Sequence, residues 1–305
     1  MLPAKSRDCT FYLAAEGFAA ELIEELGDAE PVAERLVRAF RPPSRPAWAQ
    51  NVWLDPRELA IRSIADAARQ LKAIQRNWAA YPTGLHRRAA LITEALPKVS
   101  ARPLQFPEAA PTSSLGSWTL LDAQTLLASP TCSSPFPNGE PRFVEDKAAP
   151  PNRAYLKLWE ALTLLGVRPR PGERCLDLGA SPGGWTWVLQ GLGADVLAVD
   201  RAALDARIAM LPGVHFEKHN AFTLEPASAG DIDWLCCDVI AYPEKTYELV
   251  TRWLASGRVR RIICSVKFQG KTDMAMVRRF QAIPHSSLVH LFHNKHELTF
   301  AFIAP

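Results

Sequence analysis

The feature that most constrains the fold is a regular alternation of short apolar runs with amphipathic segments, which begins near residue 152. Strands are expected at 174–178, 194–200, 214–220, 232–239 and 260–268. Helices are expected at 152–166, from 184 to about 192, at 243–256 and at 273–283, with a shorter one before 211. This alternation predicts an α/β fold with a parallel, doubly wound sheet. The last two runs, 287–294 and 296–304, have no helix between them and must be antiparallel, because a parallel pair needs a crossover.

The first part of the chain has a different texture, rich in Pro, Trp and Ala. Apolar residues at helical spacing predict one amphipathic helix over 55–81 and a second over 86–96. Residues 117–129 are expected to hold a short strand and a helical turn, and the Pro-rich stretch 129–152 a long loop. We therefore expect two parts, a smaller α+β region at 1–141 and an α/β domain at 142–305.

Composition places the chain among soluble globular proteins, with 48% hydrophobic residues and a formal net charge of +3. No apolar run approaches the roughly 20 residues of a membrane span, and no signal peptide is recognised. The six cysteines show no zinc-ligand spacing, so we expect no metal site. We expect their thiols to be reduced and the chain to be cytoplasmic. Arginines cluster at 87–88, 258–261 and 278–279. These clusters are compatible with a polyanionic partner, although solvated helix ends explain any one of them equally well.

The stretch CLDLGASPGGWTWVL, residues 175–189, joins an apolar run to a glycine-rich turn and an amphipathic segment. Gly179 and Gly184 fit the outer glycines of a dinucleotide-binding G-x-G-x-x-G turn. Ser181 and Pro182, however, place a side chain and a missing N–H where the backbone should approach a pyrophosphate. The turn is therefore a poor match for NAD.

Two acidic residues near this turn favour another cofactor. Asp177 would repel phosphates but could face an ammonium or sulfonium group, and S-adenosylmethionine carries both and no phosphate. Asp200 ends the next expected strand, where an acid can accept hydrogen bonds from ribose hydroxyls. A turn that only packs a strand on a helix would explain the glycines but not the two acids. The pattern predicts S-adenosylmethionine as the cofactor.

The stretches LDLGASPGGWTWVL and NRAYLKLWE resemble the FtsJ-type RNA ribose 2′-O-methyltransferases, most closely the family of ribosomal RNA large subunit methyltransferase M. The resemblance is strong over 142–305 and implies a Rossmann-like (class I) methyltransferase sheet completed by an antiparallel hairpin. It implies methylation of a cytidine ribose in 23S ribosomal RNA, either naked or in an assembling large subunit. It also implies an N-terminal RNA-binding THUMP module, of which residues 1–45 would be a reduced or divergent version. We expect a monomer with no membrane association.

The family uses a Lys-Asp-Lys-Glu tetrad, which Lys157, Asp238, Lys267 and Glu297 match in this sequence. The last three lie at ends of expected strands that meet at one edge of the sheet, where ligands bind in open α/β folds. A ribose hydroxyl is a poor nucleophile, so we expect Lys267 to take its proton or to stabilise the alkoxide. Asp238 and Glu297 would orient the ammonium groups and the ribose. Taken alone, Lys157 is better explained as a solvated helix residue than as a catalytic one.

The resemblance also implies the residues that contact the cofactor. Asn220 stands where the family usually has Asp to accept a hydrogen bond from the adenine amino group. The full expected set is Asp177, Gly179, Ser181, Pro182, Gly183, Gly184, Trp185, Asp200, Asn220 and Asp238.

Three alternatives stay open at this point. Cys236 or Cys237 could serve as the nucleophile of an RNA base methyltransferase, although at least one of them must point into the sheet. A non-catalytic RNA-binding or ribosome-assembly factor could keep the fold, but four intact tetrad positions argue against it. An NAD-dependent oxidoreductase is disfavoured by Ser181 and Pro182.

Overall fold

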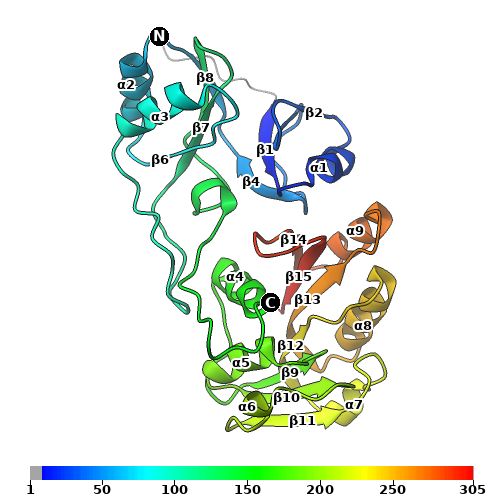
Figure 1. The fold of residues 1–305 in the computed structure, drawn as a ribbon. Coiled ribbons are helices and arrows are strands. Elements are labelled where there is room, and N and C mark those ends of the chain that lie inside the picture. Colours follow the sequence, from blue (N-terminus) through cyan, green and yellow to red (C-terminus); the bar gives the residue numbers. More distant parts are fainter. Residues whose placement is uncertain (1–8, 305) are drawn as a thin grey trace. The chain divides into compact units, whose positions relative to one another are not determined.

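The computed structural model describes residues 9–304, which form two compact units (Figure 1). The first unit ends at Arg142 and the second begins at Phe143. Residues 105–109 also belong to the second unit. There Phe106 stacks on Trp159 with ring centroids 4.9 Å apart, so this short segment is fixed to the second unit by aromatic packing.

The first unit contains two four-stranded sheets. One has the order β2-β3-β1-β4, is antiparallel throughout and is accompanied by α1 (Ala19–Leu26). Its strands are β1 (Thr10–Ala14), β2 (Ala29–Pro31), β3 (Leu36–Ala39) and β4 (Ala49–Trp53). The other has the order β5-β8-β7-β6, with only the β6–β7 pair parallel. Its elements are β5 (Arg57–Ala60), α2 (Ile64–Ile74), β6 (Trp78–Ala80), α3 (His86–Glu94), β7 (Gly116–Leu120) and β8 (Thr125–Ser129), followed by the short 3₁₀ turn η1 (Pro137–Gly139).

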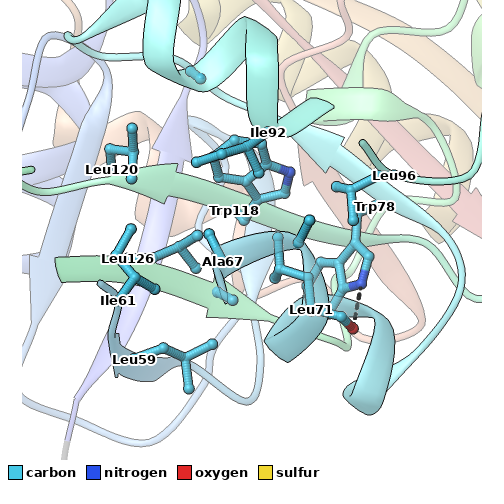
Figure 2. Close-up of a cluster of buried hydrophobic side chains, with 13 residues drawn as sticks. Leu59, Ile61, Ala67, Leu71, Trp78, Ile92, Leu96, Trp118, Leu120 and Leu126 are labelled. Atoms are coloured by element: carbon cyan, nitrogen blue, oxygen red, sulfur yellow. Dashed lines mark hydrogen bonds between the residues drawn. The ribbon is translucent and has the colours of Figure 1, made fainter. Parts of the chain in front are cut away.

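An apolar cluster between the second of these sheets and helices α2 and α3 forms its core (Figure 2). Trp118 of β7 and Ile92 of α3 are buried within it, together with Leu71 of α2. The indole N–H of Trp78 donates to the Leu71 carbonyl at 3.0 Å, so the one polar atom of this side chain is satisfied inside the apolar layer. The cluster explains why α2 and α3 are helical, since each buries a single apolar stripe.

Two expectations for the first unit are wrong. The single helix expected over 55–81 is instead strand β5, helix α2 and strand β6, because Leu59 and Ile61 alternate along an extended segment and the Ser63 hydroxyl caps α2 by accepting from the Asp66 N–H at 3.1 Å. The helical turn expected near residue 125 is strand β8, which pairs with β7 as a hairpin. In both places tertiary strand pairing overrides local helical spacing.

The second unit is built on a seven-stranded sheet with the order β11-β10-β9-β12-β13-β15-β14. The five strands from β11 to β13 are parallel, and β15 is antiparallel to both β13 and β14, so the expected doubly wound sheet with a closing antiparallel hairpin is confirmed. The strands are β9 (Arg174–Leu178), β10 (Asp195–Asp200), β11 (Val214–Lys218), β12 (Ile232–Cys237), β13 (Val259–Lys267), β14 (Ser286–Val289) and β15 (Glu297–Ile303). The helices are α4 (Tyr155–Leu165), α5 (Gly184–Gly191), α6 (Ala206–Ala209), α7 (Pro226–Ala229), α8 (Pro243–Ala255) and α9 (Met274–Gln281).

The chain reverses its direction across this sheet between β9 and β12. From β9 it proceeds outward through α5 to β10 and β11, and it then returns to β12 and proceeds through α8 to β13 on the other side. Right-handed crossovers in opposite directions place α5 and α8 on opposite faces of the sheet. Ligands of such folds bind at the carboxyl ends of the strands beside the reversal point. The ends of β9 and β12 are therefore where a site is expected.

Within the described residues, no helix has the length and apolarity needed to cross a bilayer.

Candidate active site

The glycine-rich turn after β9 is held between two neighbouring segments. Gly179 has φ +75°, and a Cβ built on it would lie 2.3 Å from Cγ2 of Val239, in the segment after β12. A Cβ on Gly184 would lie 2.2 Å from Oδ1 of Asn152, just before α4. Close packing therefore favours glycine at both positions, and the positive φ at Gly179 favours it there a second time. Packing of the turn against its neighbours therefore explains both glycines without a ligand. A bound cofactor is indicated by Asp177 and Asp200 rather than by the glycines.

Asp177 is the clearest sign of a ligand at this turn. Its side chain is 1% exposed, and its Oδ2 accepts from the Thr186 hydroxyl at 2.7 Å. Its Oδ1 is buried and has no hydrogen-bond partner among the described residues. Burial raises the pKa of Asp177 to about 7, and the nearby Asp238 and Asp200 add to the increase. A buried carboxylate oxygen with an unused acceptor position suits a cationic or hydrogen-bond-donating ligand.

Asp200, at the end of β10, ties the glycine-rich turn to the neighbouring loop. Its two carboxylate oxygens accept from the backbone N–H groups of Ser181 at 3.0 Å and Ala202 at 2.8 Å. Each oxygen keeps a further lone pair for a ligand hydroxyl. Asn220 lies beyond the end of β11, and its Oδ1 accepts from the Phe222 N–H at 3.1 Å.

Trp185 has a packing role in the structure. Its side chain is buried, and its indole N–H donates to the Ala154 carbonyl at 2.9 Å. The indole therefore fastens the start of α5 to the start of α4.

Lys157, Asp238, Lys267 and Glu297 form one cluster, here called the tetrad. Nζ of Lys157 lies 2.7 and 2.8 Å from the two carboxylate oxygens of Asp238 and 3.2 Å from Oε1 of Glu297. Nζ of Lys267 lies 2.9 Å from Oδ1 of Asp238 and donates to the Asp238 carbonyl at 2.7 Å. All four side chains are largely buried. The structure therefore brings together the four residues that the sequence placed at separate strand and helix ends.

The topology explains why the tetrad meets. Asp238 directly follows β12, and Lys267 is the last residue of the adjacent parallel strand β13. Glu297 is the first residue of antiparallel β15 and is paired in register with Lys267, so their side chains share one face of the sheet. Lys157 reaches the same edge from the first turn of α4.

Within the tetrad, the pKa values of Asp238 and Lys157 are shifted by the opposite charges around them. Burial alone would raise the pKa of Asp238, but Lys157 and Lys267 together keep it below its ordinary value. Burial alone would lower the pKa of Lys157, but the two carboxylates raise it above its ordinary value. Lys157 is therefore a permanently charged organiser, with three N–H···O contacts that use its three donors. Lys267 uses two donors on Asp238 within the described part of the chain, which leaves one for a substrate.

Glu160, which was not among the residues expected from the sequence, lies one helical turn after Lys157 on α4. Its side chain is buried, and its Oε1 accepts from the Phe292 N–H at 2.7 Å. Its Oε2 accepts from the backbone N–H of His293 at 3.0 Å and lies 2.6 Å from Nδ1 of that ring. This contact fixes the loop before β15, in which Asn294 donates to the Glu297 carbonyl at 3.2 Å. Glu160 thus connects the helix that carries Lys157 to the loop that holds the backbone of Glu297 in place.

Only one signal in the sequence could have found Glu160. A glutamate on the apolar face of a helix, three residues from a predicted catalytic lysine, is unfavourable without a buried partner.

The cysteine alternative is not supported by the structure. Cys236 and Cys237 lie in β12 at the centre of the sheet and are both buried. Burial raises the pKa of Cys236 well above its ordinary value, which disfavours the thiolate that a nucleophile requires.

One of the arginine clusters lies away from the tetrad. Arg258 pairs with Asp231 at 2.8 Å, and Arg261 lies over the Trp234 ring at 5.0 Å from its centroid. These residues surround the amino ends of β12 and β13, opposite the edge that carries the tetrad. This cluster therefore serves packing and charge balance at that edge.

Comparison with known proteins agrees with this geometry. Residues 150–295 match the model of the FtsJ-like methyltransferase family. Ribosomal RNA large subunit methyltransferase M of Halorhodospira halophila is 37% identical over 172 residues, which cover 54% of this chain and 50% of that protein. The protein of the same name from Marinomonas sp. is 34% identical over 185 residues, covering 55% of this chain and 52% of that one. The chain spans about half the length of the curated relatives it matches.

Among solved structures, TrmN from Thermus thermophilus is 15% identical with a TM-score of 0.37, over 97% of this chain and 99% of that one.

The second unit has the Rossmann-like fold of a methyltransferase domain. Within that class, residues 150–295 belong to the FtsJ-like methyltransferase family.

Proposed function

We propose that this chain transfers a methyl group from S-adenosylmethionine to a ribose 2′-hydroxyl of RNA, at a cytidine of 23S ribosomal RNA. The observation that carries the proposal is the tetrad, in which two lysines enclose one carboxylate beside the glycine-rich turn. The relatives named ribosomal RNA large subunit methyltransferase M support the choice of substrate. We further propose that the chain acts as a monomer in the cytoplasm, on naked or assembling large-subunit RNA, and that the region 1–141 binds RNA, with residues 1–45 as a reduced or divergent THUMP-like part.

The residues around the turn fit the proposed cofactor. The unpartnered Oδ1 of Asp177 would receive its ammonium group, Asp200 its ribose hydroxyls, and Asn220 its adenine amino group. The backbone of the turn would complete the site through Gly179, Ser181, Pro182, Gly183, Gly184 and Trp185, and Asp238 borders it. S-adenosylmethionine supplies a methyl group already activated by its sulfonium centre.

The chain's task is then to orient and deprotonate the hydroxyl. The third N–H of Lys267 would donate to the ribose oxygen and stabilise the negative charge that develops on it while the hydroxyl proton passes to solvent water; Lys267 could take that proton itself only after losing one of its own. Asp238 and Glu297 hold the ammonium groups in place, and Lys157 keeps those two carboxylates together. Because these groups are largely buried, their interactions with the reacting oxygen act in a low dielectric.

The direct test is to incubate the chain with methyl-labelled S-adenosylmethionine and unmodified large-subunit ribosomal RNA, then digest the RNA to nucleosides. We expect the label on a ribose, in 2′-O-methylcytidine. Label on a base, or no label in RNA, would contradict the proposal.

Because the pKa of Asp177 is raised, we expect the affinity for S-adenosylmethionine to depend on pH. Since the ionised carboxylate is the form that attracts an ammonium group, the affinity for S-adenosylmethionine should rise with pH up to about 7. Below that value it should fall by up to about tenfold per pH unit, because binding must first remove a proton. Calorimetric titrations between about pH 5.5 and 7.5 measure this slope. In that range the amino group of the cofactor stays largely protonated, so its own titration does not obscure that of Asp177. Asp177→Asn should bind weakly with a flat profile, and a flat profile in the unmodified chain would refute the role of Asp177.

Glu160 should influence the reaction through Glu297. We expect Glu160→Gln to lower kcat by about tenfold or more, because a shift near 1 Å in a reacting group is costly. In a Glu297→Gln background the same change should add little, since the group that it positions is already lost.

Glu173→Gln is the matched control for Glu160. Glu173 is also a largely buried carboxylate, but it lies before β9 and accepts from the Trp234 indole at 2.8 Å. We expect its substitution to leave kcat unchanged. If the double variant Glu160→Gln/Glu297→Gln loses kcat by the product of the two single losses, Glu160 acts independently of Glu297, and its proposed positioning role is contradicted.

A further inference from the structure

The segment between β12 and α8 exposes two large apolar side chains beside the tetrad. Ile240 is 78% exposed and Tyr242 is 59% exposed. Val239 and Ala241 are partly buried, and Pro243 is buried. This alternation is typical of an extended segment, in which every second side chain faces the same side. Ile240 and Tyr242 therefore face solvent together and form what is here called the Ile240–Tyr242 platform.

Both ends of this segment are fixed. At its start, Val239 packs so closely against the glycine-rich turn that a Cβ on Gly179 would lie 2.3 Å from it. At its end, the Tyr242 carbonyl accepts the N–H of Lys245 at 3.0 Å as the first turn of α8 begins. The two apolar side chains are thus presented on anchored backbone, which lowers the entropic cost of binding a partner on them.

The platform lies within reach of the substrate of the tetrad. Ile240 is two positions after Asp238, with only Val239 between them, so their Cα atoms are at most about 7 Å apart. The carboxylate of Asp238 in turn contacts both lysines of the tetrad, at 2.7 and 2.9 Å. A nucleotide whose ribose reaches Lys267 would place its own base, or the adjacent one, in this neighbourhood.

The chemistry of the segment selects a base over a phosphate. Residues 239–243, Val-Ile-Ala-Tyr-Pro, contain no charged side chain. An uncharged aromatic and aliphatic pair offers nothing to a phosphate, whereas unstacked RNA bases are commonly held on aromatic faces. We propose that the Ile240–Tyr242 platform binds an unstacked base of the RNA and so positions the ribose that is methylated. This inference depends on the proposed function and adds a substrate-positioning surface that lies outside the tetrad.

The test uses the whole chain with Tyr242→Ala, Tyr242→Phe and Ile240→Ser. Steady-state methylation of unmodified large-subunit ribosomal RNA gives KM and kcat, and anisotropy with a fluorescein-labelled fragment of that RNA gives Kd without turnover. We expect Tyr242→Ala to raise KM and Kd for RNA about tenfold, the range of one base–aromatic stack, with the affinity for S-adenosylmethionine unchanged. Tyr242→Phe should behave like the unmodified chain, because it keeps the ring.

Met210→Ser is the matched control. Met210 is 77% exposed, almost as much as Ile240. It lies between α6 and the start of β11, whereas the platform follows the end of β12. We expect it to leave KM for RNA unchanged, while Ile240→Ser raises it.

Several results would overturn the platform. One is a Tyr242→Ala variant whose KM and Kd for RNA match those of Met210→Ser in a chain that methylates RNA. Another is a change of oligomeric state in Tyr242→Ala on sedimentation with no change in RNA affinity, which would make the surface a contact between copies of the chain. Absence of any methyl transfer by the unmodified chain is a different result, and it contradicts the proposed function itself.

Discussion

Lys267→Ala is expected to lower the rate of methyl transfer to RNA by about a thousandfold or more, since both proton transfer and charge stabilisation are lost. Lys267 is the lysine with a donor left for the substrate, because Asp238 accepts two of its three N–H groups. Cofactor binding should survive, since the glycine-rich turn and Asp177 make no contact with this side chain in the described structure. Single-turnover transfer of labelled methyl and calorimetric titration of S-adenosylmethionine measure the two effects separately.

The control for this change is Lys245→Ala. Lys245 is a surface lysine of α8 that pairs with Glu248 at 2.9 Å, and its loss should leave the rate unchanged. Undiminished methyl transfer by Lys267→Ala would refute the assigned role. Loss of cofactor binding together with the rate would show that Lys267 supports the cofactor site instead.

Lys157→Met is expected to destabilise the chain by about 3–5 kcal/mol near neutral pH, because it leaves the largely buried Glu297 without its lysine and Asp238 with Lys267 alone. Lys157 contacts both Asp238 and Glu297, so no other residue of the tetrad replaces it between them. Methyl transfer should be lost as well. Urea unfolding followed by circular dichroism measures the change in the free energy of unfolding.

The pH dependence of this loss has a definite sign. The lysines keep the pKa of Asp238 below its ordinary value, so the pairing stabilises the fold above the unfolded pKa and is lost as pH falls through the folded pKa. Without Lys157 the carboxylate of Asp238 protonates more readily, so the difference in stability between the variant and the unmodified chain should shrink from about pH 7 to about pH 4.

A triple variant, Lys157→Met/Asp238→Asn/Glu297→Gln, should recover part of the stability but no activity. A destabilisation of Lys157→Met that does not change with pH would mean that lost packing, rather than unpaired charge, is responsible.

Much of the active site could be predicted from the sequence because parallel strands bring distant residues to one edge. Asp238 and Lys267 follow or end apolar runs, and that position alone places them together once the strands are parallel. Glu297 joins them because the final strand starts where β13 ends. The glycine-rich turn was recognisable because its departures from the dinucleotide pattern, together with Asp177, favour a cationic ligand.

Other features could not be predicted, for physical reasons. Glu160 looks like an ordinary helix glutamate until the loop at 292–293 folds against it, and no local pattern encodes that contact. The segment 55–81 has helical spacing throughout, but its two ends form strands because β5 pairs with β8 and β6 pairs with β7. The sequence leaves the cluster at 258–261 open between a polyanion contact and a solvated surface, because the contacts of Arg258 with Asp231 and of Arg261 with Trp234 follow only from the folded sheet.

RNA that lacks the target hydroxyl tests most directly whether the tetrad directs a methyl group to a ribose. Four transcripts of the large-subunit RNA are prepared, each with one of the four nucleosides incorporated in its 2′-deoxy form, and each is incubated with the chain and labelled S-adenosylmethionine. The account predicts that the transcript with 2′-deoxycytidine accepts no label while the other three do, and that Lys267→Ala labels none. Equal labelling of all four transcripts would contradict it, because the methyl group would then be going to a base.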